Sequence, residues 1–140
     1  MSDVFSKEKR SWIMSRISRG NTKPEIVVRK MLHSMGYRFR LHSKRLPGTP
    51  DIVLPRHRKI IFIHGCFWHG HKNCSRAKRP VSNEDFWNKK IETNIKRDNI
   101  VVKELCNSGW EVLIIWQCET RDHDVMLKKL LSFMTNISQR

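Results

Sequence analysis

The sequence predicts an α/β fold in which a mixed central sheet is flanked by helices. Hydrophobic periodicity gives the order of elements as one helix, three strands, a long helix, a strand and a last helix. Two of the strands are β-branched runs joined by a basic turn, whereas residues 110–116 are apolar apart from Glu111 and are expected to form a buried strand. Helices and strands in this order pack in layers around one core, which 140 residues are enough to build.

The first helix is expected to begin at Thr22 and to end at Gly36. Thr22 precedes a proline in the first turn, and Glu25 stands where a capping-box partner would stand. Its apolar face is expected to comprise Ile26, Val27, Met31 and Leu32. Residues 37–41 then alternate in the manner of a strand.

A β-hairpin is expected from the runs "DIVL" and "KIIFIH", which the basic tetrapeptide "PRHR" separates. If the loop consists of His57 and Arg58, Asp51 lies opposite His64. If the loop is one residue longer, Asp51 lies opposite Ile63. The spacing leaves both registers open, but either one brings a carboxylate, a backbone carbonyl and an imidazole to the same end of the hairpin.

Two helices are expected in the second half of the chain. The first is capped by Ser82 or Asn83 and extends to about residue 107. The second covers roughly residues 122–135, with inward side chains Val125, Met126, Leu130, Leu131 and Phe133. Residues 1–20 are polar and basic and are interpreted as a helix or arm that contacts the partner, so that residues 21–140 form a single domain.

The charge of the chain indicates a polyanionic partner. Lys and Arg number 28 against 13 Asp and Glu, which gives a net charge of +15. Such an excess favours nucleic acid or an anionic membrane surface. No apolar run approaches the ~18 residues that span a bilayer, and the first ten residues lack the apolar segment of a secretory signal. We therefore expect a cytoplasmic protein that binds nucleic acid and no membrane.

The stretch "GCFWHGHKNC" at residues 65–74 carries ligands for a metal ion. A tetrahedral zinc site needs four nitrogen or sulfur ligands, and Cys66, Cys74, Cys118 and one histidine supply them. The spacing does not decide between His69 and His71. Buried thiols in a core are the alternative interpretation, and we prefer it for Cys106, which lies on the long helix with Val102 and Leu105.

Asp51 is the candidate ligand for a second ion. It opens an otherwise apolar strand, and His64 closes the partner strand. Carboxylate and carbonyl oxygens suit Mg²⁺, and a histidine near neutral pKa can activate water. The alternative is that Asp51 is a turn residue after Pro50. Glu25 also has a structural interpretation, as the capping-box residue.

Several motifs together resemble the very-short-patch repair (Vsr) endonucleases, which nick DNA next to T:G mismatches. The resemblance runs nearly end to end, over "RSWIMSRI", "TKPE", "LPGTPDIVLP", "IFIHGCFWHGHKNC", "FWNKKIETNIKRD" and "GWEVLIIWQCE". The combination "PD…F-x-HGCFWH" is far more specific than a lone zinc pattern. The resemblance implies a restriction-endonuclease-like core with a zinc-stabilised loop, and a monomer that acts on double-stranded DNA with a T:G mismatch alongside accessory mismatch-repair proteins.

The resemblance also implies roles for individual residues. Asp51 and the carbonyl of Ile63 would bind catalytic Mg²⁺, and His69 would activate water with support from His64 and Glu25. Structural Zn²⁺ would be held by the set Cys66, His71, Cys74 and Cys118. The aromatic rings and apolar side chains that would wedge beside the mismatch are Phe67, Trp68, Trp87, Met14 and Ile17. For the rings, core packing is the alternative interpretation, which their polar loop makes less favourable.

Two features depart from the family pattern. Position 63 is Ile, where the family carries a hydroxyl-bearing residue, and the loop from His71 to Cys74 is one residue longer. A carbonyl ligand at Ile63 survives the first change, whereas a side-chain role does not. Two other functions also remain open from the sequence: a non-catalytic zinc module that binds DNA, and a related restriction-type or junction nuclease.

Overall fold

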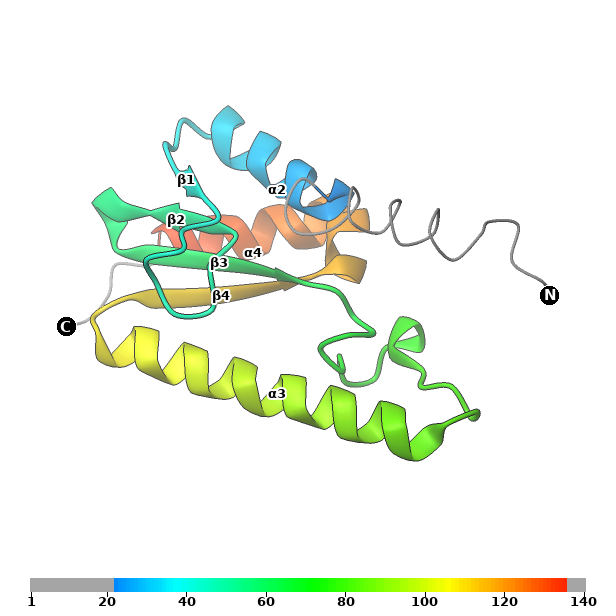
Figure 1. Ribbon diagram of the computed structural model, residues 1–140. Coiled ribbons are helices and arrows are strands. Elements are labelled where there is room, and N and C mark those ends of the chain that lie inside the picture. Colours follow the sequence, from blue (N-terminus) through cyan, green and yellow to red (C-terminus); the bar gives the residue numbers. More distant parts are fainter. Residues whose placement is uncertain (1–21, 136–140) are drawn as a thin grey trace, which may run out of the picture.

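The computed structural model describes residues 22–135 and contains one mixed, four-stranded sheet. The strands are β1 (Arg40–Leu41), β2 (Ile52–Leu54), β3 (Lys59–His64) and β4 (Glu111–Trp116), and they lie in this order across the sheet (Figure 1). The pairs β1–β2 and β2–β3 are antiparallel, and β3–β4 is parallel. The parallel pair is joined by a long crossover that contains the helix α3 (Glu84–Asn107).

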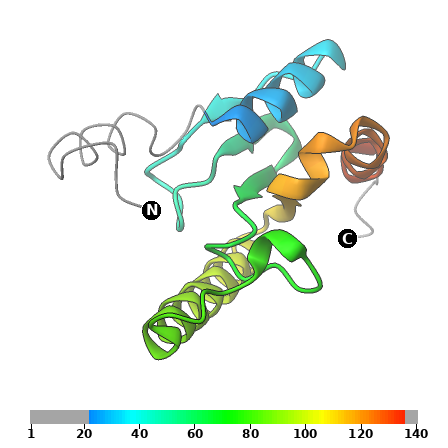
Figure 2. The same cartoon turned by 90° about the vertical axis from the view of Figure 1, so that its right-hand side faces the viewer.

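Helices cover both faces of the sheet. The helices α2 (Lys23–Ser34) and α4 (His123–Thr135) pack on one face through Val28, Leu32, Met126 and Leu130. On the other face α3 contributes Leu105 to a second core cluster. Figures 1 and 2 show this arrangement, with α3 on the side of the strands opposite α2 and α4. The predicted order of elements and the helix-flanked mixed sheet are therefore confirmed.

The strand β4 is apolar after Glu111 because both of its faces are covered, not because it lies in the middle of the sheet. Leu113 and Ile115 pack with α2 and α4, while Val112 and Ile114 pack with the α3 cluster. Within residues 22–135, β4 is an edge strand that pairs only with β3, so it is mostly half-buried, and Ile115 alone is fully buried. The expectation of a buried strand is therefore correct for one residue and too strong for the rest.

Several finer expectations about the helices and the first strand are wrong. Thr22 takes the N-cap position of α2 as expected, but its side chain makes no capping hydrogen bond with the described residues. The strand expected over residues 37–41 is only Arg40–Leu41. On α4 the side chains of Met126, Leu130 and Met134 are buried and the expected Phe133 packs against the core, whereas Val125 and Leu131 are exposed. Cys106 is exposed as well, because it faces away from the side of α3 that buries Leu105.

The hairpin between β2 and β3 has neither of the two expected registers. Leu54 pairs with Lys59 and Ile52 with Ile61, because Pro55–His57 form a short 3₁₀ helix and Arg58 takes a left-handed conformation with φ of 56°. The turn is thus longer than either expected loop. Asp51 lies just before β2, and its carboxylate still reaches the backbone N–H of Ile63. The expected meeting of carboxylate and imidazole at this end of the hairpin is retained.

Two glycines let loops approach α3 closely at the site end of the sheet. Gly70 has φ of 61°, and a Cβ there would lie 2.7 Å from Ile95 and 2.9 Å from Ile91. Gly48 has φ of 75°, and a Cβ there would lie 2.5 Å from Val101. Glycine tolerates both the positive φ and the contact. The loops on either side of the site are therefore held against the same helix.

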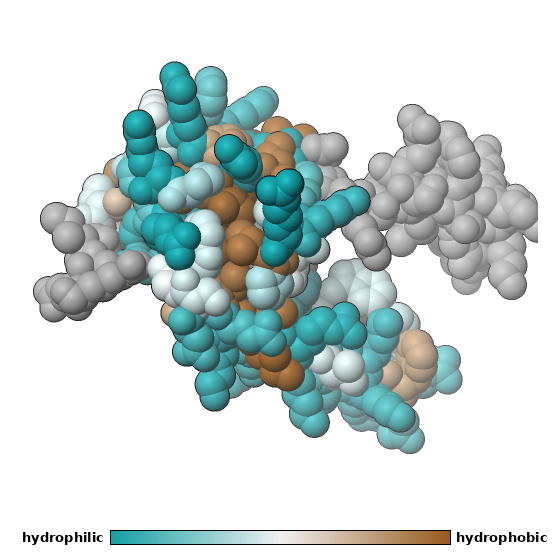
Figure 3. All heavy atoms as spheres, turned by 60° about the vertical axis from the view of Figure 1, so that its left-hand side comes forward, coloured by the Kyte–Doolittle hydropathy of each residue, from teal (hydrophilic) through white to brown (hydrophobic). Residues whose placement is uncertain are grey.

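Hydrophilic side chains dominate the surface in Figure 3, where an apolar band runs between them. None of the helices within residues 22–135 combines the length and apolar character needed to cross a membrane. The expected amino-terminal arm, with Met14 and Ile17, lies outside the described residues.

Candidate active site and metal centre

A cavity of about 290 Å³ opens where β3 ends and the crossover begins. Side chains from β3, α3 and the loop before β2 line it, and the polar ones are Thr49, Asp51, His64, His69, Asn94, Arg97 and Asp98. Ile63 also lines it. Three of the four residues expected to act in catalysis, Asp51, His64 and His69, therefore share one cavity, although Asp51 and His69 are 18 positions apart in the sequence.

Asp51 is fixed by the backbone of the neighbouring strand. Its Oδ2 accepts a hydrogen bond of 2.8 Å from the Ile63 N–H. Burial raises the pKa of the Asp51 carboxyl, although the Ile63 N–H and the nearby His42 and Arg29 act in the opposite direction. A buried carboxylate whose negative charge is only partly compensated is a good site for a cation.

Glu25 occupies the first turn of α2 but points into the protein, where it is 1% exposed. Its two carboxylate oxygens lie 3.0 and 2.9 Å from His42 Nε2, and Arg29 donates a hydrogen bond to it. The potential ligand atoms of Glu25, His42 and Asp51 lie within 4.8 Å of one another. Sequence patterns did not single out His42 or Arg29, and only the helical spacing of Glu25 and Arg29 hinted at that pair.

His64 and His69 stack face to face, with ring centroids 3.8 Å apart and an interplanar angle of 8°. His69 Nδ1 lies 2.6 Å from Asp98 Oδ2. Burial, with the neighbouring His69, lowers the pKa of His64 to about 4, so His64 is neutral at physiological pH. Asp98 was not predicted. It lies on α3, 29 positions beyond His69, within a run of charged residues that resembles an ordinary solvated helix face.

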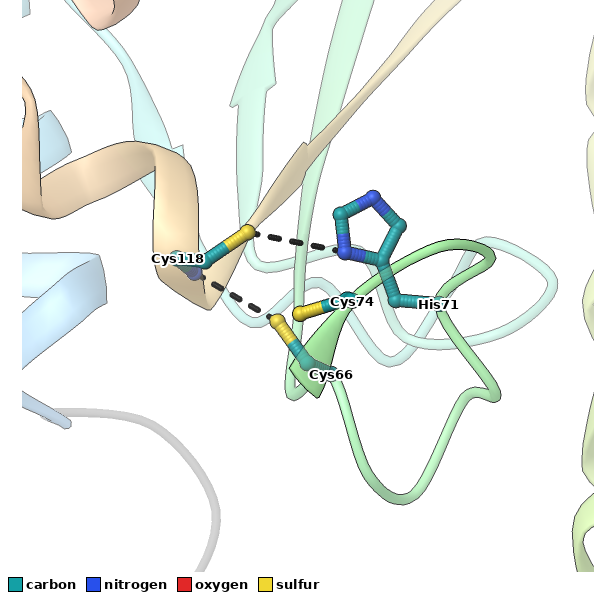
Figure 4. A group of neighbouring side chains, drawn as sticks. All are labelled: Cys66, His71, Cys74 and Cys118. Carbon is teal, nitrogen blue, oxygen red and sulfur yellow. Dashed lines mark hydrogen bonds between the residues drawn. The ribbon is translucent and has the colours of Figure 1, made fainter. Parts of the chain in front are cut away.

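Cys66, His71, Cys74 and Cys118 form a second cluster (Figure 4), with ligand atoms within 4.8 Å of one another. Cys118 Sγ lies 3.5 Å from His71 Nδ1, and the Cys118 N–H donates a 3.4 Å hydrogen bond to Cys66 Sγ. Burial, with the hydrogen bonds and charge of Cys66 and Cys74, raises the pKa of the Cys118 thiol to about 12. Three crowded thiols and an imidazole are a donor set that a divalent cation would stabilise. This set includes His71 and leaves His69 beside Asp98.

The aromatic side chains of the loop and of α3 form one cluster, in which Phe67 and Trp87 are half-buried and Trp68 and Phe86 are exposed. Ring centroids of Phe67 lie 5.2 Å from Trp68 and 5.4 Å from Trp87. Trp68 is 47% exposed, and Phe86, which was not predicted, is 59% exposed and lies 5.1 Å from Trp87. Among the described residues, the rings belong to neither of the two core clusters, which makes core packing a less favourable interpretation of them. Asn94 donates a 2.9 Å hydrogen bond to the Trp68 carbonyl and so fastens the loop to α3.

Comparisons with known proteins agree with this arrangement. The family model described as DNA mismatch endonuclease Vsr matches residues 2–76. The chain is 47% identical to the type II nicking enzyme V.XorIIP of Xanthomonas oryzae pv. oryzae, over 96% of this chain and 98% of that protein. It is 38% identical to the DNA mismatch endonuclease Vsr of Escherichia coli (strain K12), over 94% of this chain and 84% of that protein.

A solved structure is similar as well. The catalytic domain of the homing endonuclease I-Bth0305I aligns with a TM-score of 0.55 and 25% identity, over 84% of this chain and all of that chain. The sheet with its flanking helices is therefore a framework that a DNA-cutting enzyme also uses.

Proposed function

Because the chain belongs to the Vsr family of DNA mismatch endonucleases and is a mismatch-directed nicking enzyme, we propose that it cuts one DNA strand beside a T:G mismatch by Mg²⁺-dependent hydrolysis. The observation that carries this proposal is the position of Asp51 and the His64–His69 pair in one cavity. A DNA-binding module without catalysis does not need that grouping, which makes the non-catalytic alternative unnecessary.

The oxygen atoms around Asp51 fit Mg²⁺. The Asp51 carboxylate and the Ile63 carbonyl would hold the ion, and the Glu25 carboxylate lies near that of Asp51. These are hard oxygen donors of the kind that Mg²⁺ prefers, and the only partly compensated charge of buried Asp51 favours a cation. When bound, Mg²⁺ would stabilise the negative charge that develops on the phosphate and would make a bound water molecule easier to ionise. A backbone ligand at Ile63 explains how the site tolerates an aliphatic side chain at this position.

His69 is the proposed general base. The Asp98 carboxylate accepts a hydrogen bond from Nδ1, which leaves Nε2 of the neutral ring without a proton and able to take one from water. His64 stays neutral and stacks on the ring, so it limits rotation of His69 without adding charge. Asp98 and His64 therefore act as positioning residues.

The cysteine cluster is the proposed structural zinc site, and its task is to stiffen the aromatic loop. Cys118 follows β4, whereas Cys66 and Cys74 bracket the loop (Figure 4), so an ion held by all three fastens the loop to the sheet. The loop presents Phe67 and Trp68 beside Trp87 on α3. Pushing rings between stacked bases costs a few kcal/mol, and a loop that is already ordered pays little further entropy.

Other parts of the proposal rest on charge and on the family. The net charge of +15 supports binding to phosphates along the duplex. Residues 1–20 are proposed as an arm that contacts DNA, with Met14 and Ile17 pressing on the duplex from the groove opposite the aromatic rings. We expect the protein to work as a monomer in the cytoplasm, alongside accessory mismatch-repair proteins.

Replacement of Asp51 by Asn tests the site. Asp51→Asn should bind mismatched duplex as tightly as wild type but lose nicking by about a thousandfold or more, because an amide replaces a charged Mg²⁺ ligand worth several kcal/mol in the transition state. Asp124→Asn is the matched control, since Asp124 is an aspartate 90% exposed on α4. Nicking by Asp51→Asn within a few-fold of the control would disprove the role of Asp51.

A further inference from the structure

The cavity that holds Asp51 is lined by a single strongly basic side chain. Arg97, on α3, is the one Lys or Arg among the described residues that line it. We propose that Arg97 binds the scissile phosphate and stabilises the negative charge that develops on its non-bridging oxygens during hydrolysis. The inference rests on the proposed function, because it assigns a further catalytic residue to the same site.

The position of Arg97 follows from the spacing of residues along α3. Asn94 and Val101 stand three residues before it and four residues after it, so the three share one side of the helix. That side faces the site. Asn94 donates a 2.9 Å hydrogen bond to the Trp68 carbonyl, and a Cβ on Gly48 would lie 2.5 Å from Val101. Arg97 therefore lies on the side of α3 that forms a wall of the cavity.

The Arg97 guanidinium is available to a substrate. The residue is exposed, and within residues 22–135 its side chain has no hydrogen bond or ion pair. The neighbouring Asp98 carboxylate is engaged by His69, with 2.6 Å between Oδ2 and Nδ1. Arg29, the guanidinium on α2, donates a hydrogen bond to Glu25 and does not line the cavity. A phosphate that enters the cavity would therefore meet Arg97.

A phosphate in this cavity needs positive charge from the protein. The carboxylates of Asp51 and Asp98 both line the cavity, and their charge repels a phosphodiester. His64 gives no compensation, because burial lowers its pKa to about 4 and leaves it neutral. A guanidinium stays charged and presents a planar fork of N–H donors that matches phosphate oxygens. Arg97 therefore offsets the repulsion, and its hydrogen bonds strengthen as charge grows on those oxygens in the transition state.

The alternative is that Arg97 is an ordinary solvated cation on a basic helix. Exposed lysines are common on α3, namely Lys89, Lys90, Lys96 and Lys103. Such residues can contact phosphates anywhere along a duplex, and none of these four lines the cavity. The two interpretations differ in what they affect. Loss of a general phosphate contact weakens affinity, whereas loss of a contact made in the transition state slows hydrolysis of bound DNA.

Single-turnover nicking and equilibrium binding, both on the full-length protein, separate these effects. Arg97→Ala should nick saturating T:G duplex about 10²–10³-fold more slowly, the usual loss when one donor to a developing charge is removed. Its Kd for the duplex, measured in chelator so that no cutting occurs, should rise by no more than a few-fold. Lys96→Ala is the matched control, because it removes an exposed cation about 100° away around the same helix. It should nick within a few-fold of wild type.

A phosphorothioate at the scissile position shows whether Arg97 contacts that phosphate. Sulfur accepts hydrogen bonds poorly, so it weakens the contact in wild type and has little further effect in Arg97→Ala. The ratio of the wild-type rate to the Arg97→Ala rate should therefore shrink for at least one of the two diastereomers. The same ratio should keep its full size when the sulfur is placed on the next phosphate along the strand.

Melting temperatures and a second variant guard against misfolding. Alanine is a strong helix former at an exposed helical position, so Arg97→Ala should melt close to Lys96→Ala. Arg97→Lys keeps the charge but loses the fork, so its nicking rate should lie between those of wild type and Arg97→Ala, and the sulfur comparison is made on it if Arg97→Ala does not fold.

Three results would overturn the role of Arg97. They are nicking by folded Arg97→Ala within a few-fold of Lys96→Ala, a loss of affinity as large as the loss of rate, and a rate ratio that sulfur leaves unchanged in both diastereomers. Failure of wild type to nick any duplex would instead overturn the proposed function itself.

Discussion

Removal of the Trp68 ring should greatly reduce mismatch discrimination without unfolding the protein. Trp68 is 47% exposed, so about half of its surface contributes to stability. A fully buried aromatic side chain hides ~150–250 Å², and half of the upper value at ~25 cal/mol per Å² gives roughly 3 kcal/mol at most for Trp68→Ala. Domains of this size are stable by about 5–15 kcal/mol, so the variant is expected to fold.

The effect on DNA recognition has a different origin. A T:G wobble pair differs little in shape from a matched pair, but its step is easier to pry open, and a wedge converts that difference into binding energy. Stacking of a base on an aromatic ring is worth ~1–3 kcal/mol, so Trp68→Ala should lose roughly ten- to a hundredfold of its preference for T:G over matched duplex. Nonspecific affinity should stay close to wild type, because Lys and Arg make the phosphate contacts.

The assay is a pair of equilibrium titrations, with T:G and matched duplexes of one sequence and a fluorescent base analogue beside the mismatch. The analogue should brighten with wild type and stay quenched with Trp68→Ala. Leu131→Ala is the control, because Leu131 is an apolar residue of similar exposure, 42%, on the distant helix α4. Full discrimination by a folded Trp68→Ala would refute the wedge, and global unfolding of that variant would show that the ring is core after all.

Three further predictions concern zinc, salt and pH. The purified protein should hold one zinc per chain, and Cys118→Ser should lower both the zinc content and the melting temperature, because the ion ties the loop to the end of β4; elemental analysis without metal in folded protein would contradict this. If binding neutralises ~6–10 phosphates, DNA affinity should fall ~10³–10⁵-fold between 50 and 200 mM salt, and a flat titration would show that the charge of +15 serves another purpose. Below pH 6.5, His64 is protonated in the unfolded chain but stays neutral in the folded protein, where burial lowers its pKa to about 4. The free energy of unfolding of wild type should therefore fall by roughly 3 kcal/mol relative to that of His64→Asn between pH 6.5 and pH 4, and a constant difference in urea titrations would refute this.

The element order could be predicted because each segment carries its own periodicity. The long helix α3 ends at Asn107, as the glycine two residues later indicated. The continuous apolar run of β4 indicated two covered faces correctly, but periodicity does not distinguish an edge strand with helices on both sides from a central one. The inward face of α4 was misplaced for the same kind of reason, since Val125 and Leu131 are as apolar as the residues that are buried.

In the candidate site too, residues with a local sequence signal could be predicted, whereas residues brought in by packing between distant segments could not. Asp51 and His64 could be singled out because they stand at recognisable strand ends, whereas the role of His69 was implied only by the family resemblance. Asp98 and His42 were missed because their roles arise only when α3 and the loop after β1 pack against the hairpin. The register of Asp51 was missed because it depends on a 3₁₀ turn and a left-handed Arg58, which the basic turn sequence does not specify.

Single-turnover nicking rates on matched, T:G-mismatched and branched duplexes, each with Mg²⁺ and with chelator, test the proposed activity most directly. The expected result is one cut strand on the T:G duplex, only with Mg²⁺, at a rate that Asp51→Asn reduces by about a thousandfold or more. Cutting of both strands, equal rates on the matched or branched duplex, or an undiminished rate in chelator would contradict the proposed function.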